Sequence, residues 1–102
     1  MVKIFIAVKR ELAFSPKTEE IVRKWEQKGT VIVFARQYSF NKGQEKEMMQ
    51  KVRKEIADCD TMVAIGDNSI GVGIEIGIAY ALGKKIIIET EEVSATLKGV
   101  ES

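Results

Sequence analysis

Four short runs of apolar residues constrain the fold of this 102-residue chain more than any other feature of its sequence. The runs are rich in β-branched residues, and apolar and polar residues do not alternate within them. A strand with one face in water shows that alternation, whereas a strand covered on both faces is apolar throughout. We therefore predict a parallel sheet with helices on its faces, built from residues 4–8, 31–35, 62–65 and 86–88.

Helical patterns separate these runs. Ser15 and Pro16 are typical of a helix start, and apolar residues then recur at helical spacing until Gly29. Two further helices are predicted over about residues 44–57 and 71–82, and a short one around 94–98. The alternation of strands and helices predicts an α/β fold. We expect a small doubly wound (flavodoxin- or Rossmann-like) parallel sheet of about four strands flanked by helices, in a single domain over residues 1–102.

A sheet of four strands has two open edges. Exposed edges can pair with other chains, so proteins cover them. We expect either that a partner covers an edge here or that a fifth strand is missing. The expectation is a homodimer or a higher homo-oligomer.

The composition limits what the domain could do. The formal net charge is +1, whereas proteins that bind a nucleic-acid backbone carry a large positive excess. The sequence contains no histidine, which excludes Ser-His-Asp and Cys-His triads and histidine zinc sites. The single cysteine, Cys59, can form neither an internal disulfide nor a multi-cysteine zinc site. The apolar run at residues 4–8 is too short for a signal peptide or a membrane span. We expect a cytoplasmic protein that binds neither nucleic acid nor a membrane and uses no metal or cofactor.

The glycine-rich segment 69–77, which follows the third predicted strand, is the candidate functional centre. Ligands of open parallel sheets bind beyond the carboxyl ends of the strands, where loops lead into helix N-termini. Ser69 is placed to cap the helix, while Gly71 and Gly73 would let backbone N–H groups approach a ligand closely. The segment therefore indicates a site for phosphate or another anion.

Three better-known motifs do not fit. A dinucleotide fingerprint requires glycine at position 76, where this chain has Ile76. A phosphate-binding P-loop requires Ser or Thr after Gly-Lys, and Lys85 stands there. A receiver domain would have acidic residues after the first strand, where this chain has Lys9 and Arg10.

Two interpretations of Glu75 remain open from spacing alone. It is either an acid favoured by the positive end of a helix or a functional carboxylate. Gly73, Gly77 and Ala81 are four residues apart and share one helix face, which predicts tight packing of that face on the sheet.

The residues from Asp60 to Lys84 resemble the nucleoside 2-deoxyribosyltransferase superfamily, and most of all its 2'-deoxynucleoside 5'-monophosphate N-glycosidases. The specific part is the string Ser-x-Gly-x-Gly-x-Glu-x-Gly at 69–77, followed by Ala-Leu-Gly-Lys at 81–84. The resemblance implies that Glu75 is a nucleophile that attacks the anomeric carbon of the deoxyribose as the base departs. Water or an acceptor base would then complete the reaction. We expect the helix N-terminus to help keep Glu75 ionised, so activity should fall at acid pH.

The same resemblance implies roles for further residues in binding a small deoxynucleotide. It implies that Ser69 and Arg10 contact the 5'-phosphate, that Gly71 and Gly73 offer backbone donors, and that Ser94 reaches the phosphate in a neighbouring subunit's site. For the base, the loop after the second strand offers Arg36, Gln37 and Tyr38, which no motif ranks.

Two of the chain's departures from the family pattern bear on the site. Ala7 and Val8 stand where the family usually has Gly-Ser, and an acid expected in the second helix falls near Val52. These departures keep a second hypothesis open, a non-catalytic nucleotide-binding or sensor module with the same fold. A third, a phosphoribohydrolase of the cytokinin-activating type, lacks the Pro-Gly-Gly signature of that group.

Overall fold

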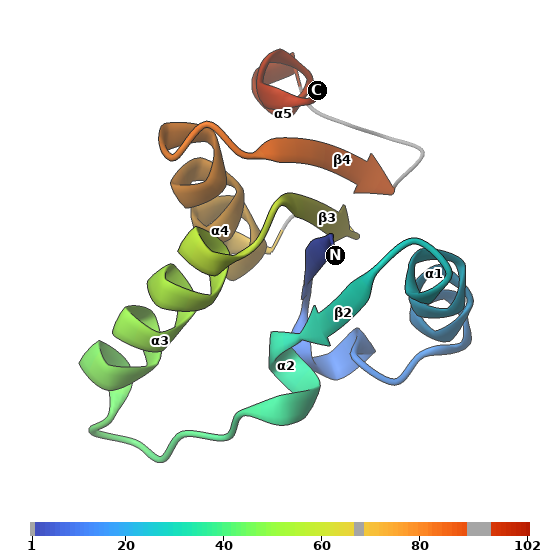
Figure 1. The fold of residues 1–102 in the computed structure, drawn as a ribbon. Coiled ribbons are helices and arrows are strands. Elements are labelled where there is room, and N and C mark those ends of the chain that lie inside the picture. The colour runs from blue at the N-terminus through green and yellow to red at the C-terminus, as the bar shows by residue number, and fades with distance from the viewer. Residues whose placement is uncertain (1, 67–68, 90–94) are drawn as a thin grey trace.

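The computed structural model describes residues 2–66, 69–89 and 95–102, and it has an all-parallel sheet of four strands with helices on both faces (Figure 1). The strand order is β2-β1-β3-β4, which confirms the predicted doubly wound α/β fold. The elements are β1 (Lys3–Val8), the 3₁₀ turn η1 (Arg10–Leu12), α1 (Pro16–Glu26), β2 (Thr30–Val33), α2 (Phe34–Gln37), α3 (Glu45–Asp58), β3 (Thr61–Ile65), α4 (Ile70–Ala81), β4 (Lys85–Glu89) and α5 (Ala95–Val100).

The two faces of the sheet are covered by different helices. Helix α1 covers one face, and its Trp25 lies in the same buried cluster as Ile4 of β1 and Val63 of β3. Helices α3 and α4 cover the other face, where Val52 and Ile76 lie in a second buried cluster (Figure 1). The central strands β1 and β3 are therefore covered on both sides, as their continuous apolar sequences predicted.

The second strand is shorter than predicted. It ends at Val33, and Phe34 begins the helical turn α2. The turn places the Phe34 ring in the core, with its centroid 6.2 Å from that of Phe5 and 4.7 Å from that of Tyr38. A β-strand pattern and a buried helical turn look alike in a short apolar run, and tertiary contacts decided between them here.

The exposed face of α4 overturns one prediction. The residues that α4 buries are Val72, Ile76 and Ala79. Gly73, Gly77 and Ala81 are exposed, and a Cβ added at either glycine would meet no atom within 4 Å. The small residues therefore do not bring α4 close to its own sheet.

The outer edge of β4 is hydrogen-bonded by the C-terminal residues of the chain itself. The Ser102 N–H donates to the Ile86 carbonyl at 2.7 Å, and the Ser102 hydroxyl accepts from the Ile86 N–H at 2.9 Å. A Glu101 carboxylate oxygen accepts from the Ile88 N–H at 3.0 Å. These bonds pair part of the outer edge of β4 with the residues that follow α5. None of the helices in the described ranges is long and apolar enough to cross a membrane.

Candidate active site

The candidate site lies at the carboxyl edge of the sheet, where the strand order reverses. The chain passes from β1 to β2 on one side and then returns to β3 on the other side of β1. A doubly wound sheet opens a crevice at such a reversal, beyond the ends of the two central strands. The residues after β1 and the start of α4 line this crevice.

Two adjoining pockets occupy the crevice. The inner pocket has a volume of about 160 Å³ and the outer pocket about 490 Å³. The inner pocket is lined by Ile6, Val8, Arg10, Phe34, Ala35, Met48, Met49, Val52, Gly71, Ile74 and Glu75. The outer pocket is lined by Val8, Lys9, Arg10, Glu11, Ser69, Ile70, Gly71, Val72 and Glu75.

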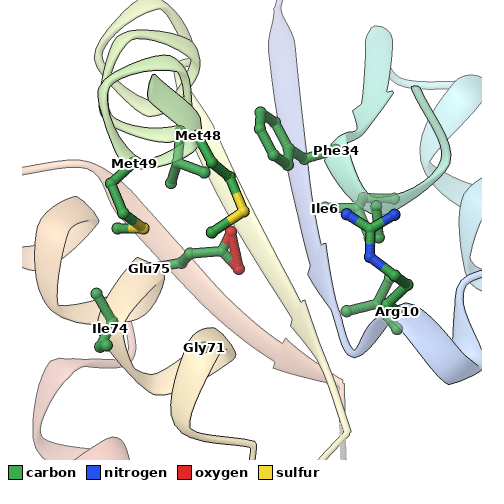
Figure 2. Close-up of a pocket in the computed structure, with 11 residues that line it drawn as sticks. Ile6, Arg10, Phe34, Met48, Met49, Gly71, Ile74 and Glu75 are labelled. Atoms are coloured by element: carbon green, nitrogen blue, oxygen red, sulfur yellow. The ribbon is translucent and has the colours of Figure 1, made fainter. Parts of the chain in front are cut away.

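The inner pocket is apolar apart from one carboxylate and one guanidinium. Phe34 forms one wall, Met48 and Met49 of α3 form another, and the Glu75 carboxylate points into the space between them (Figure 2). Aromatic rings and polarizable methionine side chains suit a flat heteroaromatic group. The inner pocket therefore fits a ring that binds through its faces more than through hydrogen bonds to its edge.

The outer pocket is polar and lies at the N-terminus of α4. Ser69 caps this helix: its hydroxyl accepts from the Val72 N–H at 3.4 Å. The first N–H groups of a helix have no acceptor within the helix, and its dipole favours negative charge there. Arg10 brings a guanidinium to the same space, and Lys9 an ammonium that lies 3.9 Å from the Glu11 carboxylate. These groups together suit an anion such as a phosphate.

Glu75 lines both pockets, and burial raises its pKa from the usual 4.5 to about 7. The cause is desolvation, because little water reaches a carboxylate buried beside apolar side chains. The expectation that the helix N-terminus would keep Glu75 ionised does not hold in this structure. The residue sits in the second turn of α4, whereas the dipole acts mainly within the first turn.

The site brings together four of the six residues named from the sequence. Glu75, Arg10 and Gly71 line both pockets, and Ser69 lines the outer one. Gly73 differs, because its N–H donates to the Ser69 carbonyl at 3.0 Å and is not free for a ligand. Ser94 lies outside the described residues.

The residues suggested for base binding are engaged elsewhere. Arg36 donates to the Ala13 carbonyl at 2.6 Å and forms an ion pair with Glu19. The Tyr38 hydroxyl donates to Glu55 at 3.3 Å. Gln37 is exposed and does not line either pocket. Phe34, three residues earlier, is the residue of this segment whose ring lines the inner pocket.

Met48 and Met49 lie within the helix predicted over about residues 44–57, and sequence reasoning did not place them in a site. The signal that could have identified them is the direction in which α3 runs relative to the strand that follows it. A helix that leads into a parallel strand runs antiparallel to it, so the first turns of α3 lie at the carboxyl edge of the sheet. Both departures from the family pattern also lie here, since Val8 lines both pockets and Val52 the inner one. No group of three or more acidic or cysteine side chains in the described ranges is arranged to hold a metal ion.

No protein-family model and no curated protein matches this sequence. Several solved structures are similar. The CMP N-glycosidase BcmB of Clostridium botulinum shares 27% identity with a TM-score of 0.68, and the match covers 96% of this chain and 79% of that chain.

Two further structures share the fold at lower identity. The 2-deoxyribosyltransferase of the psychrotolerant bacterium Bacillus psychrosaccharolyticus shares 19% identity with a TM-score of 0.72, covering 98% of this chain and 82% of that one. A conserved protein of Enterococcus faecalis V583 shares 21% identity with a TM-score of 0.69, covering 94% of this chain and 69% of that one.

Proposed function

The chain belongs to the nucleoside 2-deoxyribosyltransferase-like superfamily, and we propose that it cleaves the N-glycosidic bond of a 2'-deoxynucleoside 5'-monophosphate with Glu75 as the nucleophile. The observation that carries this proposal is the position of Glu75, which lines both an apolar pocket and a polar pocket that holds Arg10 and a helix N-terminus. A nucleotide has the matching order of parts, with a flat base, a sugar and a phosphate.

The two pockets support a proposed place for each part of the nucleotide. The base enters the inner pocket beside Phe34 and the two methionines, and the 5'-phosphate enters the outer pocket beside Arg10 and the start of α4. The sugar then spans the boundary that the two pockets share. Its anomeric carbon lies within reach of Glu75, which is the geometry that a displacement at that carbon requires.

The chemistry follows from a carboxylate at this position. A Glu75 oxygen forms a bond to the anomeric carbon while the bond from that carbon to the base nitrogen breaks, and the electron pair leaves with the base. The departing base takes a proton from water. In the second step a water oxygen attacks the anomeric carbon, Glu75 is released as a carboxylate, and the water proton goes to solvent.

Two observations support a monophosphate as the substrate. The outer pocket places the Arg10 guanidinium beside a helix N-terminus, and both groups suit a phosphate, although Lys9 in the same pocket is paired with Glu11 at 3.9 Å. The BcmB structure is named for activity on CMP, which also carries one 5'-phosphate. Ribonucleotides and cytosine therefore belong in any substrate panel.

A second candidate function is nucleotide binding without turnover. Val52 favours it, because this residue is 3% exposed in the wall of the inner pocket and gives that wall an apolar group where an acid is expected. A carboxylate with a raised pKa and no acidic neighbour on α3 could hold a nucleotide without cleaving it. The two functions differ in a single measurable product, the free base.

The test is incubation of the purified protein with each of the four deoxynucleoside 5'-monophosphates and with CMP, with the released base measured by chromatography. We expect base release that is lost in Glu75→Gln and retained in Glu20→Gln, which makes the same change at an exposed position of α1. A second series with excess free adenine separates transfer from hydrolysis, because transfer produces a new nucleotide.

Base release that persists in Glu75→Gln would contradict the nucleophilic role. Binding of the nucleotides to wild type without release of any base would overturn the enzyme proposal in favour of the binding module.

A further inference from the structure

Two arginines beside the site each donate a hydrogen bond to the other's segment of the chain. The Arg10 guanidinium donates to the Tyr38 carbonyl at 3.4 Å, and Tyr38 directly follows α2. Arg36 of α2 donates in the opposite direction, from its Nε to the Ala13 carbonyl at 2.6 Å. Ala13 directly follows the turn η1, which begins at Arg10. The segment that carries Arg10 and the segment that carries Arg36 are therefore joined from both sides.

The two arginines have different surroundings. Arg10 lines both pockets, whereas Arg36 lines neither. The Arg36 side chain is only 17% exposed, and it forms an ion pair with Glu19 of α1. Its guanidinium also lies over the Phe14 ring, 4.9 Å from the ring centroid. A guanidinium can make all these contacts at once, because it has several donors at its edge and a flat face that stacks on rings.

The Ala13 carbonyl belongs to a buried part of the turn that carries Arg10. Ala13 is 1% exposed, and its N–H donates to the Arg10 carbonyl at 3.2 Å. The neighbouring Leu12 carbonyl accepts from the Thr18 hydroxyl at 2.7 Å. A buried carbonyl that loses its hydrogen bond is costly, so the fold retains the bond from Arg36. That bond fixes the end of η1 relative to α2.

We propose that Arg36 is a positioning residue of the nucleotide site, which fixes η1 against α2 and so holds the Arg10 guanidinium where a ligand phosphate binds. The inference rests on the nucleotide site of the proposed function and not on the reaction at Glu75. A long side chain that its surroundings already hold in place binds more tightly than one that the ligand must first order.

The effect should be on the phosphate more than on the base. The Phe34 ring of the inner pocket is held by its own packing, with centroid distances of 6.2 Å to Phe5 and 4.7 Å to Tyr38. Within the described part of the chain, the Arg10 guanidinium makes one hydrogen bond, which at 3.4 Å is long. The position of Arg10 therefore depends on the two backbone segments that Arg36 joins.

The experiment measures dissociation constants by calorimetry for the four deoxynucleoside 5'-monophosphates and for the matching nucleosides. Every protein carries Glu75→Gln, so that no base is released during a titration. We expect Arg36→Met to raise the Kd of a bound nucleotide about 10-fold, because a small displacement of a binding group weakens its contacts strongly. The Kd of the matching nucleoside should change little, since it has no phosphate for Arg10 to bind.

A double-mutant cycle separates positioning from a general loss of stability. If Arg36 acts through Arg10, then Arg36→Met should not weaken nucleotide binding further in a protein that already carries Arg10→Met. Two independent contributions would instead multiply, and the double variant would bind more weakly than either single variant.

Glu19→Ala tests the same arrangement with a second variant. It removes the ion-pair partner of Arg36, and it should fold because alanine is a good helix former. We expect a smaller rise in the Kd of the nucleotide, again dependent on Arg10. Lys24→Met is the matched control, since it breaks another ion pair of α1, with Glu89 at 2.8 Å, whose residues line neither pocket. It should leave every Kd unchanged, and circular dichroism checks that each variant is folded.

Equal losses for nucleotide and nucleoside, effects that multiply in the cycle, or unchanged affinity in both Arg36→Met and Glu19→Ala would overturn the inference. Binding of none of the nucleotides would overturn it together with the proposed function. Because binding is measured without turnover, the coupling of Arg36 to Arg10 can be present even if wild type releases no base. That result would support the inference and overturn only the proposed reaction.

Discussion

Arg10 and Glu75 line the same two pockets, although one follows β1 and the other lies within α4. They do not form an ion pair with each other among the described residues. Arg10 instead donates to the Tyr38 carbonyl at 3.4 Å, and burial rather than the guanidinium sets the raised pKa of Glu75. Because the two side chains are not paired with each other, the Arg10 guanidinium can bind an anion of the ligand. The Glu75 carboxylate can in turn approach a carbon atom of the ligand.

The proposed activity should begin to fall at a higher pH than is usual for a reaction that depends on a glutamate carboxylate. The proposed reaction requires an ionised Glu75, and the pKa of this residue is raised to about 7. We expect kcat/KM to fall about tenfold for each pH unit below roughly 6, as the carboxylate takes up its proton. The profile should be measured with the nucleoside as well as the nucleotide, because the substrate phosphate itself titrates near pH 6. A rate that rises toward acid pH would assign Glu75 the role of a proton donor.

Glu75 should also make stability depend on pH. Its pKa is about 7 when folded and close to the usual 4.5 when unfolded, so between these values the folded chain binds more protons. Its stabilising contribution is present below pH 4.5 and is lost as the pH rises to 7. We expect Glu75→Gln to raise the free energy of unfolding at pH 8 by about 3 kcal/mol, at 1.36 kcal/mol for each pKa unit.

Urea denaturation at pH 4.5 and pH 8 measures this difference. The variant should gain little at pH 4.5, where the wild-type carboxyl is protonated in the folded state. An equal gain at both pH values would show that the carboxylate is not destabilised by burial.

Arg10 should contribute to affinity for the phosphate. Because charge-assisted hydrogen bonds contribute about 1.5–3 kcal/mol, Arg10→Met should raise KM for a 5'-monophosphate roughly 10- to 100-fold. It should change KM for the matching nucleoside much less, since that substrate has no group in the outer pocket. Arg23→Met, an equivalent change at an exposed position of α1, is the control. Equal losses for nucleotide and nucleoside would place Arg10 outside the phosphate subsite.

The two serine caps allow the structural and the binding role of Ser69 to be separated. Ser15 and Ser69 each accept a hydrogen bond from the N–H three residues later. Replacing either with alanine should cost about 1 kcal/mol of stability, the usual contribution of a helix cap. Only Ser69→Ala should also raise KM for the nucleotide, because Ser15 lines neither pocket. Matching KM values in the two variants would make Ser69 a plain cap.

The periodicity of the sequence predicted most of the fold. Continuous apolar runs predicted buried parallel strands, and the serine caps and glycines marked where helices begin and end. These signals are local, because each depends on residues that are close in the chain. The end of β2 was missed because a strand and a buried helical turn have the same composition over a few apolar residues, and packing of Phe34 against Phe5 decided between them.

The residues of the candidate site also fall into those that the local sequence predicted and those that depend on the tertiary structure. The motif at residues 69–77 pointed to Ser69, Gly71 and Glu75, since their spacing places them within the first two turns of one helix. Arg10 came from a family likeness, and its presence beside Glu75 depends on the order of the strands.

Only the tertiary structure decided what surrounds the carboxylate and which face of α4 is free. The desolvation of Glu75, the methionine wall and the exposure of Gly77 all depend on how α3 and α4 lie against the sheet. Local spacing gives the face of a helix on which a residue lies. It does not predict which residues pack against that face, because those residues come from distant parts of the chain.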